Sequence, residues 1–238
     1  MLPYRFLSSN VVKAIALLLA STCAWYLGYL FAENLSEDTI QFAINNIQNI
    51  GERPVMKAPP PRRQKCDHWT ACPEGNYAYR VLTGGGRSNL PKICFEDVMV
   101  IGEKNENVDR GLNIAVIDYK TGKSINTKSF DTYEKDVSGD VVKFLKDVPQ
   151  NSIILIATHD EAANKLTEDA KKALEEFGSK EIRNLRFRSS WSFVSAKGVK
   201  LPDNIEKEKI NHSDDSKNRY SGWPAEMQIE GCIPKPQL

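Results

Sequence analysis

An apolar stretch near the N-terminus decides which compartment the rest of the chain folds in. Residues 14–32 carry no charged side chain, follow Arg5 and Lys13, and end where Glu33 begins polar sequence. This pattern is typical of a secretory signal peptide, 1–32, with cleavage after Ala32. The stretch also approaches the roughly 20 apolar residues that span a bilayer, so a retained signal anchor is the alternative. In either case the remaining chain faces an oxidising compartment.

Four cysteines lie downstream of this stretch, and a fifth, Cys23, lies inside it. An even set of cysteines in an oxidising compartment predicts two disulfides, and no metal or other cofactor is expected. Zinc is the alternative, but the sequence has no Cys-x-x-Cys pair and only His68 lies beside a cysteine. Sequence position leaves all three pairings open among Cys66, Cys72, Cys94 and Cys232.

The two Asn-x-Ser sequons agree with passage through the secretory route. Asn34 lies almost at the expected cleavage position, so Asn211 is the candidate glycosylation site. With the signal peptide removed, we expect no membrane anchor in the mature protein.

The mature chain divides into a linker and one folded domain. Residues 33–65 are the expected pro-region or linker, because isoleucines at helical spacing lack a firm cap in its first half and Pro and Arg dominate its second. The pair Arg62-Arg63 is either a processing site or a solvated part of this linker. The domain is then expected over 66–238.

The pattern within the domain predicts an α+β fold. The continuous apolar run 152–157 predicts a strand buried on both faces. Helices are expected after Ser138 and after Thr167, the second ending before Gly178. Further strands, the fourth and fifth of them forming a hairpin, are expected at 77–82, 92–95, 98–101, 112–118, 125–130, 182–187, 191–196 and 227–230, with a helical or irregular segment at 203–219.

The sequence offers no complete motif for catalysis or for nucleic-acid binding. The glycine-rich loop 84–88 lacks the Lys of a phosphate-binding loop, so a permissive turn is the favoured interpretation. A nucleophile elbow is also missing, and we expect no enzymatic activity. The 32 basic and 31 acidic residues leave a net charge of +1 without a sustained basic run, so no nucleic-acid partner is expected.

The best-placed polar cluster, 158–161, directly follows the buried strand. In layered α/β arrangements, groups at such a strand end face a crevice where ligands bind. Asp160, together with Arg110, Arg188 and Trp191, supplies carboxylate, guanidinium and indole groups that suit a hydroxyl-rich ligand. The alternative is that the charged groups form ion pairs and that Trp191 belongs to the core.

Six strings carry more information together than the single motifs: KCDHW (65–69), KICFED (92–97), RGLNIA (110–115), FRSSW (187–191), RYSGWP (219–224) and EGCIP (230–234). From about residue 50 to residue 236, the chain resembles the secreted cytokine-like family that includes pancreatic-derived factor (PANDER) and the interleukin-like inducer of epithelial-mesenchymal transition.

That resemblance implies a compact β-β-α fold, with two packed antiparallel sheets lined by short helices. It implies disulfides that join Cys66 to Cys94 and Cys72 to Cys232. It further implies a non-enzymatic, hormone-like signal of pancreatic islets, released through secretory granules. Such a signal would act through an unidentified cell-surface receptor on islet cell survival (apoptosis), insulin secretion and glucose metabolism.

A carbohydrate-binding function is the alternative that the resemblance carries. The domain is similar to the GG-type lectin domains of an O-mannose N-acetylglucosaminyltransferase stem and of hyaluronan-handling ectoproteins. In those domains the matching positions line a sugar site, which assigns a glycan-binding role to Arg110, Asp160, Arg188 and Trp191. Ser189 departs from the pattern, because many relatives have an acidic residue at this position.

Overall fold

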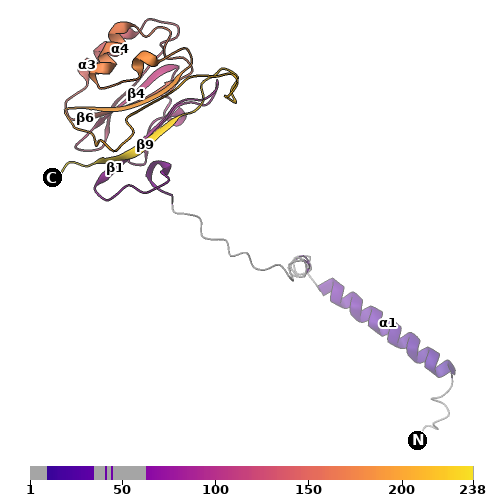
Figure 1. Ribbon diagram of the computed structural model, residues 1–238. Helices are drawn as coiled ribbons and strands as arrows, with labels where there is room; N and C mark the ends of the chain where they lie inside the picture. Colours follow the sequence, from indigo (N-terminus) through magenta and orange to yellow (C-terminus); the bar gives the residue numbers. More distant parts are fainter. Residues whose placement is uncertain (1–9, 35–40, 42–43, 45–62, 238) are drawn as a thin grey trace. The chain divides into compact units, whose positions relative to one another are not determined.

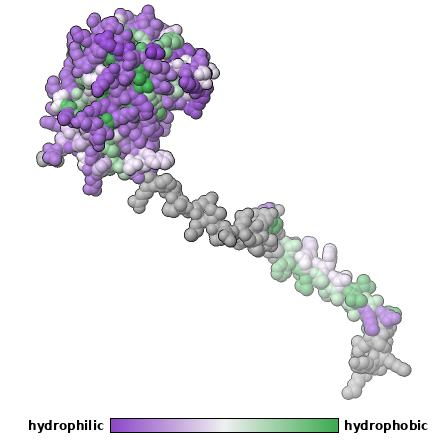
Figure 2. Space-filling model, viewed as in Figure 1, coloured by the Kyte–Doolittle hydropathy of each residue, from purple (hydrophilic) through white to green (hydrophobic). Residues whose placement is uncertain are grey.

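The computed structural model describes residues 10–34, 41, 44 and 63–237. The chain divides into two units, Met1–Pro60 and Pro61–Leu238. In the first unit, α1 (Asn10–Asn34) is one continuous helix, which Figure 2 shows with an apolar surface. Its segment Asn10–Glu33 is long and apolar enough to cross a membrane, a property that an N-terminal signal sequence shares. Most of the expected linker lies outside the described residues.

In the second unit, the described residues 63–237 form two antiparallel sheets and two helices (Figure 1). The four-stranded sheet has the order β3-β2-β1-β9, formed by β1 (Asn76–Leu82), β2 (Lys92–Phe95), β3 (Val98–Ile101) and β9 (Gln228–Pro234). The five-stranded sheet has the order β5-β4-β6-β7-β8, formed by β4 (Gly111–Asp118), β5 (Ser124–Phe130), β6 (Ser152–His159), β7 (Ser190–Lys197) and β8 (Glu208–Asn211). The helices are α3 (Ser138–Asp147) and α4 (Glu168–Glu176), and the three short 3₁₀ turns are Lys65–Asp67, Glu103–Asn105 and Ile182–Asn184.

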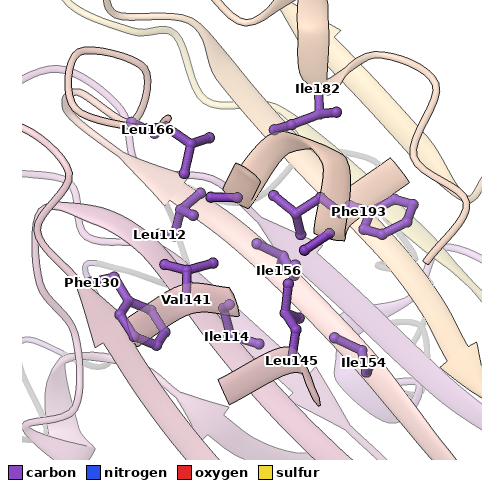
Figure 3. Packing of buried hydrophobic residues seen from close by; sticks show 14 of the residues in the cluster. Leu112, Ile114, Phe130, Val141, Leu145, Ile154, Ile156, Leu166, Ile182 and Phe193 are labelled. Atoms are coloured by element: carbon purple, nitrogen blue, oxygen red, sulfur yellow. The ribbon is translucent and has the colours of Figure 1, made fainter. Parts of the chain in front are cut away.

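The strand β6 is buried along its whole length, as its apolar sequence predicts. Ile154 and Ile156 belong to the core that the five-stranded sheet forms with α3 and α4 (Figure 3). The alternate residues Ile153 and Leu155 belong to the second core, between the two sheets. Burial of each such side chain contributes about 1.5–3 kcal/mol to folding. The chain is therefore layered as sheet, sheet and helices, and the predicted α+β, β-β-α fold is confirmed.

A segment before β1 is attached to the outer face of the four-stranded sheet by two disulfides. We call residues 63–75 the N-terminal strap. Cys66 is bonded to Cys94 of β2, and Cys72 is bonded to Cys232 of β9, the same pairs that the family resemblance implies. Ile93 and Phe95, on both sides of Cys94, and Ile233, next to Cys232, pack into the core between the sheets, so these two cysteines point to the opposite face.

One expectation about the second half of the domain is wrong and another holds only in part. The segment 182–187 is not a strand: Ile182–Asn184 forms a 3₁₀ turn and a loop follows it, because Glu208 and Ser179 bind the backbone N–H groups of Lys180, Glu181 and Ile182. The charged segment 203–219 is irregular, as expected, except at the strand β8, which pairs with β7. The predicted hairpin of β4 and β5 is confirmed.

Candidate functional site

Three of the four predicted ligand residues lie next to one end of the adjacent strands β4, β6 and β7 in the five-stranded sheet. Gly111, the first residue of β4, lies opposite His159, the last residue of β6. Because the strands are antiparallel, Arg110 and Asp160 leave the sheet side by side. Arg188 lies two residues before β7, the neighbour of β6 on its other side. We call Arg110, His159, Asp160, Arg188 and Trp223 the strand-end cluster.

Asp160 and Arg188 form the centre of this cluster. The Nε atom of Arg188 lies 3.8 Å from Oδ1 of Asp160, close enough for an ion pair but too far for a hydrogen bond. Both atoms are buried, and neither has a hydrogen-bond partner within the described part of the chain. Leaving a buried polar group unpaired costs about 1–3 kcal/mol, and a further polar group that bonded to both atoms would offset this cost.

The backbone holds both residues in an uncommon conformation. Asp160 has φ 54° and Arg188 has φ 55°, in the left-handed region. The buried carboxylate of Glu161 fixes the second of these, since its Oε2 accepts a 2.9 Å hydrogen bond from the backbone N–H of Arg188. Its Oε1 accepts hydrogen bonds from the N–H groups of Ala163 and Asn164. Such conformations cost of order 1–3 kcal/mol and occur preferentially at ligand sites.

Trp191 does not fit the predicted role of a sugar-covering ring. It is fully buried, its ring stacks on Phe193 with centroids 5.4 Å apart, and its Nε1 donates a 2.8 Å hydrogen bond to Glu208. Trp191 is therefore a core residue, which was the alternative to a ligand-binding role. The indole beside the guanidinium group of Arg188 is that of Trp223, with its ring centre 3.7 Å from Cζ.

Arg110 lies at the same edge, but other residues bind its guanidinium group. Its Nε and Nη2 atoms donate to Asp131 over 3.1 and 2.7 Å, and Nη2 also lies 2.8 Å from Glu134. The guanidinium group covers the ring of Tyr133 at 4.6 Å. These hydrogen bonds raise the pKa of Arg110, and the one from Arg110 holds the pKa of Asp131 below its usual value.

His159 is the buried base of the cluster. Burial lowers the pKa of its imidazole, and Arg110 acts in the same direction while Asp160 and Asp109 oppose it. Its Nδ1 is buried without a hydrogen-bond partner in the part of the chain that the structure describes. A Cβ atom on Gly84 would collide with this Nδ1, so glycine is required where the loop crosses His159.

The glycine-rich loop is a turn, as its sequence predicts, and it braces the loop that carries Trp223. Gly85 pairs with Asn89, and a Cβ atom on Gly85 would collide with the side chain of Glu226. The carboxylate of Glu226 accepts hydrogen bonds from Asn89 Nδ2 at 2.8 Å and from the Tyr220 hydroxyl at 2.5 Å. These bonds connect the glycine turn to the segment on both sides of Trp223.

Two other residues singled out in the sequence lie beside the cluster. Ser189 is buried and its Oγ lies 2.8 Å from Nδ1 of His212, so the position that departs from the lectin pattern is already in contact with another side chain. Asn211 is the exposed last residue of β8. A groove of about 340 Å³ between β5 and α3 contains none of the cluster residues.

Comparison with known proteins assigns the family. The profile described as Interleukin-like EMT inducer matches residues 110–199, which include Arg110, Asp160 and Arg188. Protein FAM3B of Homo sapiens is 54% identical over 231 residues, 97% of this chain and 98% of the relative. The chain belongs to the FAM3 family. Protein FAM3C of Rattus norvegicus is 41% identical and human Protein FAM3A 39% identical, each over 184 residues, 77% of this chain and 79% of the relative.

Three residues of the site, His159, Glu161 and Trp223, could not be assigned a role from the sequence. Glu161 and His159 belong to the polar cluster after β6, but their roles depend on contacts with residues distant in sequence. Trp223 lies in the string RYSGWP, which carries the family resemblance without indicating a ligand role. The position of Trp223 between Gly and Pro indicates a loop, whereas a core tryptophan is expected within a strand or helix. That position was the one indication in the sequence that Trp223 could contact a ligand.

The burial of His159 predicts an acid-sensitive stability. In the unfolded chain its pKa returns to about 6.5, so as the pH falls below that value the unfolded state takes up a proton that the folded state resists. We expect the free energy of unfolding to fall with an additional slope of at most about 1.4 kcal/mol per pH unit. Urea titrations from pH 7.5 to 5.0 measure this slope, which His159→Gln should remove.

Absolute stabilities of the two proteins can differ without affecting this test, because only the pH dependence is compared. Parallel pH profiles for the unchanged protein and His159→Gln would contradict the assignment.

Proposed function

We propose that this chain is a secreted, non-enzymatic, cytokine-like signalling protein that acts through an unidentified cell-surface receptor. The observation that carries the proposal is the match to human Protein FAM3B along 97% of the chain, together with the match to the family described as Interleukin-like EMT inducer. The apolar N-terminal helix and the two disulfides fit export into an oxidising compartment.

The proposal includes the processing of the chain. Cleavage after Ala32 would remove most of α1 and start the mature protein at Glu33, without a membrane anchor. Residues 33–65 would then be a pro-region or linker before a domain at 66–238. The exposed position of Asn211 at the end of β8 leaves its side chain accessible for N-glycosylation. The proposal extends to storage in secretory granules and to action on islet cell survival, insulin secretion and glucose metabolism.

A cell assay tests the signalling function. The full chain is expressed in mammalian cells, and the protein purified from the medium should begin at Glu33 by mass spectrometry. Added to cultured islet cells, it should change viability and glucose-stimulated insulin secretion in a dose-dependent manner. The same preparation with both disulfides reduced and alkylated serves as the control and should be inactive, because the strap is then released. A disulfide-intact protein without effect at any dose would contradict the proposal.

Glycan binding is a second candidate function, supported by the unpaired atoms of Asp160 and Arg188. A sugar hydroxyl placed between them can donate to Oδ1 and accept from Nε, which satisfies both buried atoms at once. Phe187, whose side chain is 57% exposed, lies 5.2 Å from the same guanidinium group. It offers an accessible aromatic face for the apolar side of a sugar ring.

The charges of the cluster favour a neutral sugar. Arg110 is neutralised by Asp131 and Glu134, and Arg188 faces Asp160. No surplus positive charge is left among these groups to attract a uronate or a sialic acid. The ligand that fits is therefore a neutral, hydroxyl-rich saccharide.

A glycan array with matched variants tests this second function. Asp160→Ala removes both oxygens that could accept the sugar hydroxyl, and we expect at least tenfold weaker binding, since a hydrogen bond to a charged group contributes about 1.5–3 kcal/mol. Asp147→Ala, at an exposed position on α3, is the control and should bind like the unchanged protein. Binding that survives Asp160→Ala would exclude this site, and absence of binding by the unchanged protein would exclude the function.

A further inference from the structure

The two disulfides of the N-terminal strap differ in their access to solvent. Cys66 is 1% exposed and its partner Cys94 is 6% exposed, so their bond is shielded from an attacking thiol. Cys72 and Cys232 are only half-buried. Thiol exchange requires in-line access to a sulfur atom. Access alone therefore makes Cys72–Cys232 the more reactive bond.

A buried histidine lies against this same bond. His68 of the strap is 7% exposed, and its Nε2 lies 2.7 Å from the carbonyl oxygen of Tyr79. A carbonyl only accepts hydrogen bonds, so Nε2 carries the proton and Nδ1 presents its lone pair. That Nδ1 lies 3.7 Å from Sγ of Cys72. A ring nitrogen of His68 and the Sγ atoms of Cys72 and Cys232 all lie within 4.8 Å of one another.

The histidine has different partners in the two redox states of the bond. While Cys72 and Cys232 are joined, neither sulfur carries a proton for Nδ1. After reduction, the Cys72 thiol can donate to Nδ1 or transfer its proton to it, giving a thiolate beside an imidazolium. Such a pair stabilises the reduced form and makes the disulfide easier to reduce. Sγ of Cys66 instead lies 3.7 Å from the carbonyl oxygen of Ala78, which cannot take up a proton.

We propose that Cys72–Cys232 is a thiol-exchange site for dithiol reductants, with His68 stabilising the reduced Cys72. A reductant thiol loses its proton to solvent, and the resulting thiolate attacks Sγ of Cys232. The Cys72–Cys232 bond breaks, the electron pair of that bond passes to Sγ of Cys72, and Cys72 takes up a proton from solvent that it shares with Nδ1 of His68. The second thiol of the reductant then attacks the mixed disulfide and releases Cys232 as a thiol. Two electrons and two protons pass from the dithiol to the protein, and the reductant leaves as a disulfide.

Reduction at this site leaves the rest of the fold connected. The seven residues of β9 remain paired with β1, and Lys235 keeps its 3.2 Å ion pair with Glu96. The Cys66–Cys94 bond continues to hold the first half of the strap. Opening Cys72–Cys232 therefore frees the second half of the strap locally.

Graded reduction of the full secreted protein tests the proposal. The protein is equilibrated with reduced and oxidised dithiothreitol at increasing ratios, alkylated, and analysed by peptide mass spectrometry. Cys72 and Cys232 should become alkylated at a lower ratio than Cys66 and Cys94. In His68→Gln the side-chain amide can still donate to Tyr79, but it cannot take up a proton. The Cys72–Cys232 equilibrium should shift roughly tenfold towards the disulfide, about 30 mV for a two-electron couple.

The Cys66–Cys94 bond is the reference within the same molecule and should not shift in His68→Gln. Reduction of Cys66–Cys94 first, or an unchanged Cys72–Cys232 equilibrium in the variant, would overturn the proposal. If His68→Gln does not fold, an experiment on the unchanged protein still tests the proposal. A thioredoxin-type reductant that retains only its attacking cysteine should be trapped on Cys232, and trapping on Cys72 would contradict the assigned leaving group.

Discussion

The double burial of β6 is the constraint on which the rest of the structure depends. Its odd and even residues enter different hydrophobic cores, so a shift of one residue in register would exchange every side chain between the two. β4 and β7 are fixed on either side of it by antiparallel pairing. The position of the strand-end cluster follows, because Arg110, Asp160 and Arg188 all leave the sheet where these three strands meet one edge.

Although the paired strands hold the strand-end cluster in place, two features of it are energetically unfavourable. Asp160 and Arg188 have left-handed backbone conformations, and their facing charged atoms are buried without a hydrogen bond to the described residues. Glu161 holds the backbone of Arg188 in place. A folded protein retains such costly features when the surrounding structure imposes them, and at ligand sites they preorganise polar groups for binding. The positions of Asp160 and Arg188 are therefore set by the pairing of β6 with β7 and by the contact with Glu161.

Local sequence patterns predicted those strands and helices whose conformation is determined by residues adjacent in the sequence. The run SIILIA specified a doubly buried strand because no polar residue interrupts it, and most other strands follow from short β-prone runs between Gly and Pro. The failures lie where a distant side chain decides the backbone. Glu208 turns the segment after Ser179 and fastens Trp191 inside the core, and neither effect can be recognised from neighbouring residues. The role of Trp223 depends equally on a contact with Arg188, across 35 residues of sequence that no periodicity connects.

Native-state hydrogen exchange measured by NMR tests the central role of β6 most directly. If β6 is the last element to open, the backbone amides of its residues 153–158 should exchange only through global unfolding. Their opening free energies should then equal the free energy of unfolding, while amides of the edge strand β5 exchange through smaller openings. Amides of β6 that exchange as fast as those of β5 would contradict this account.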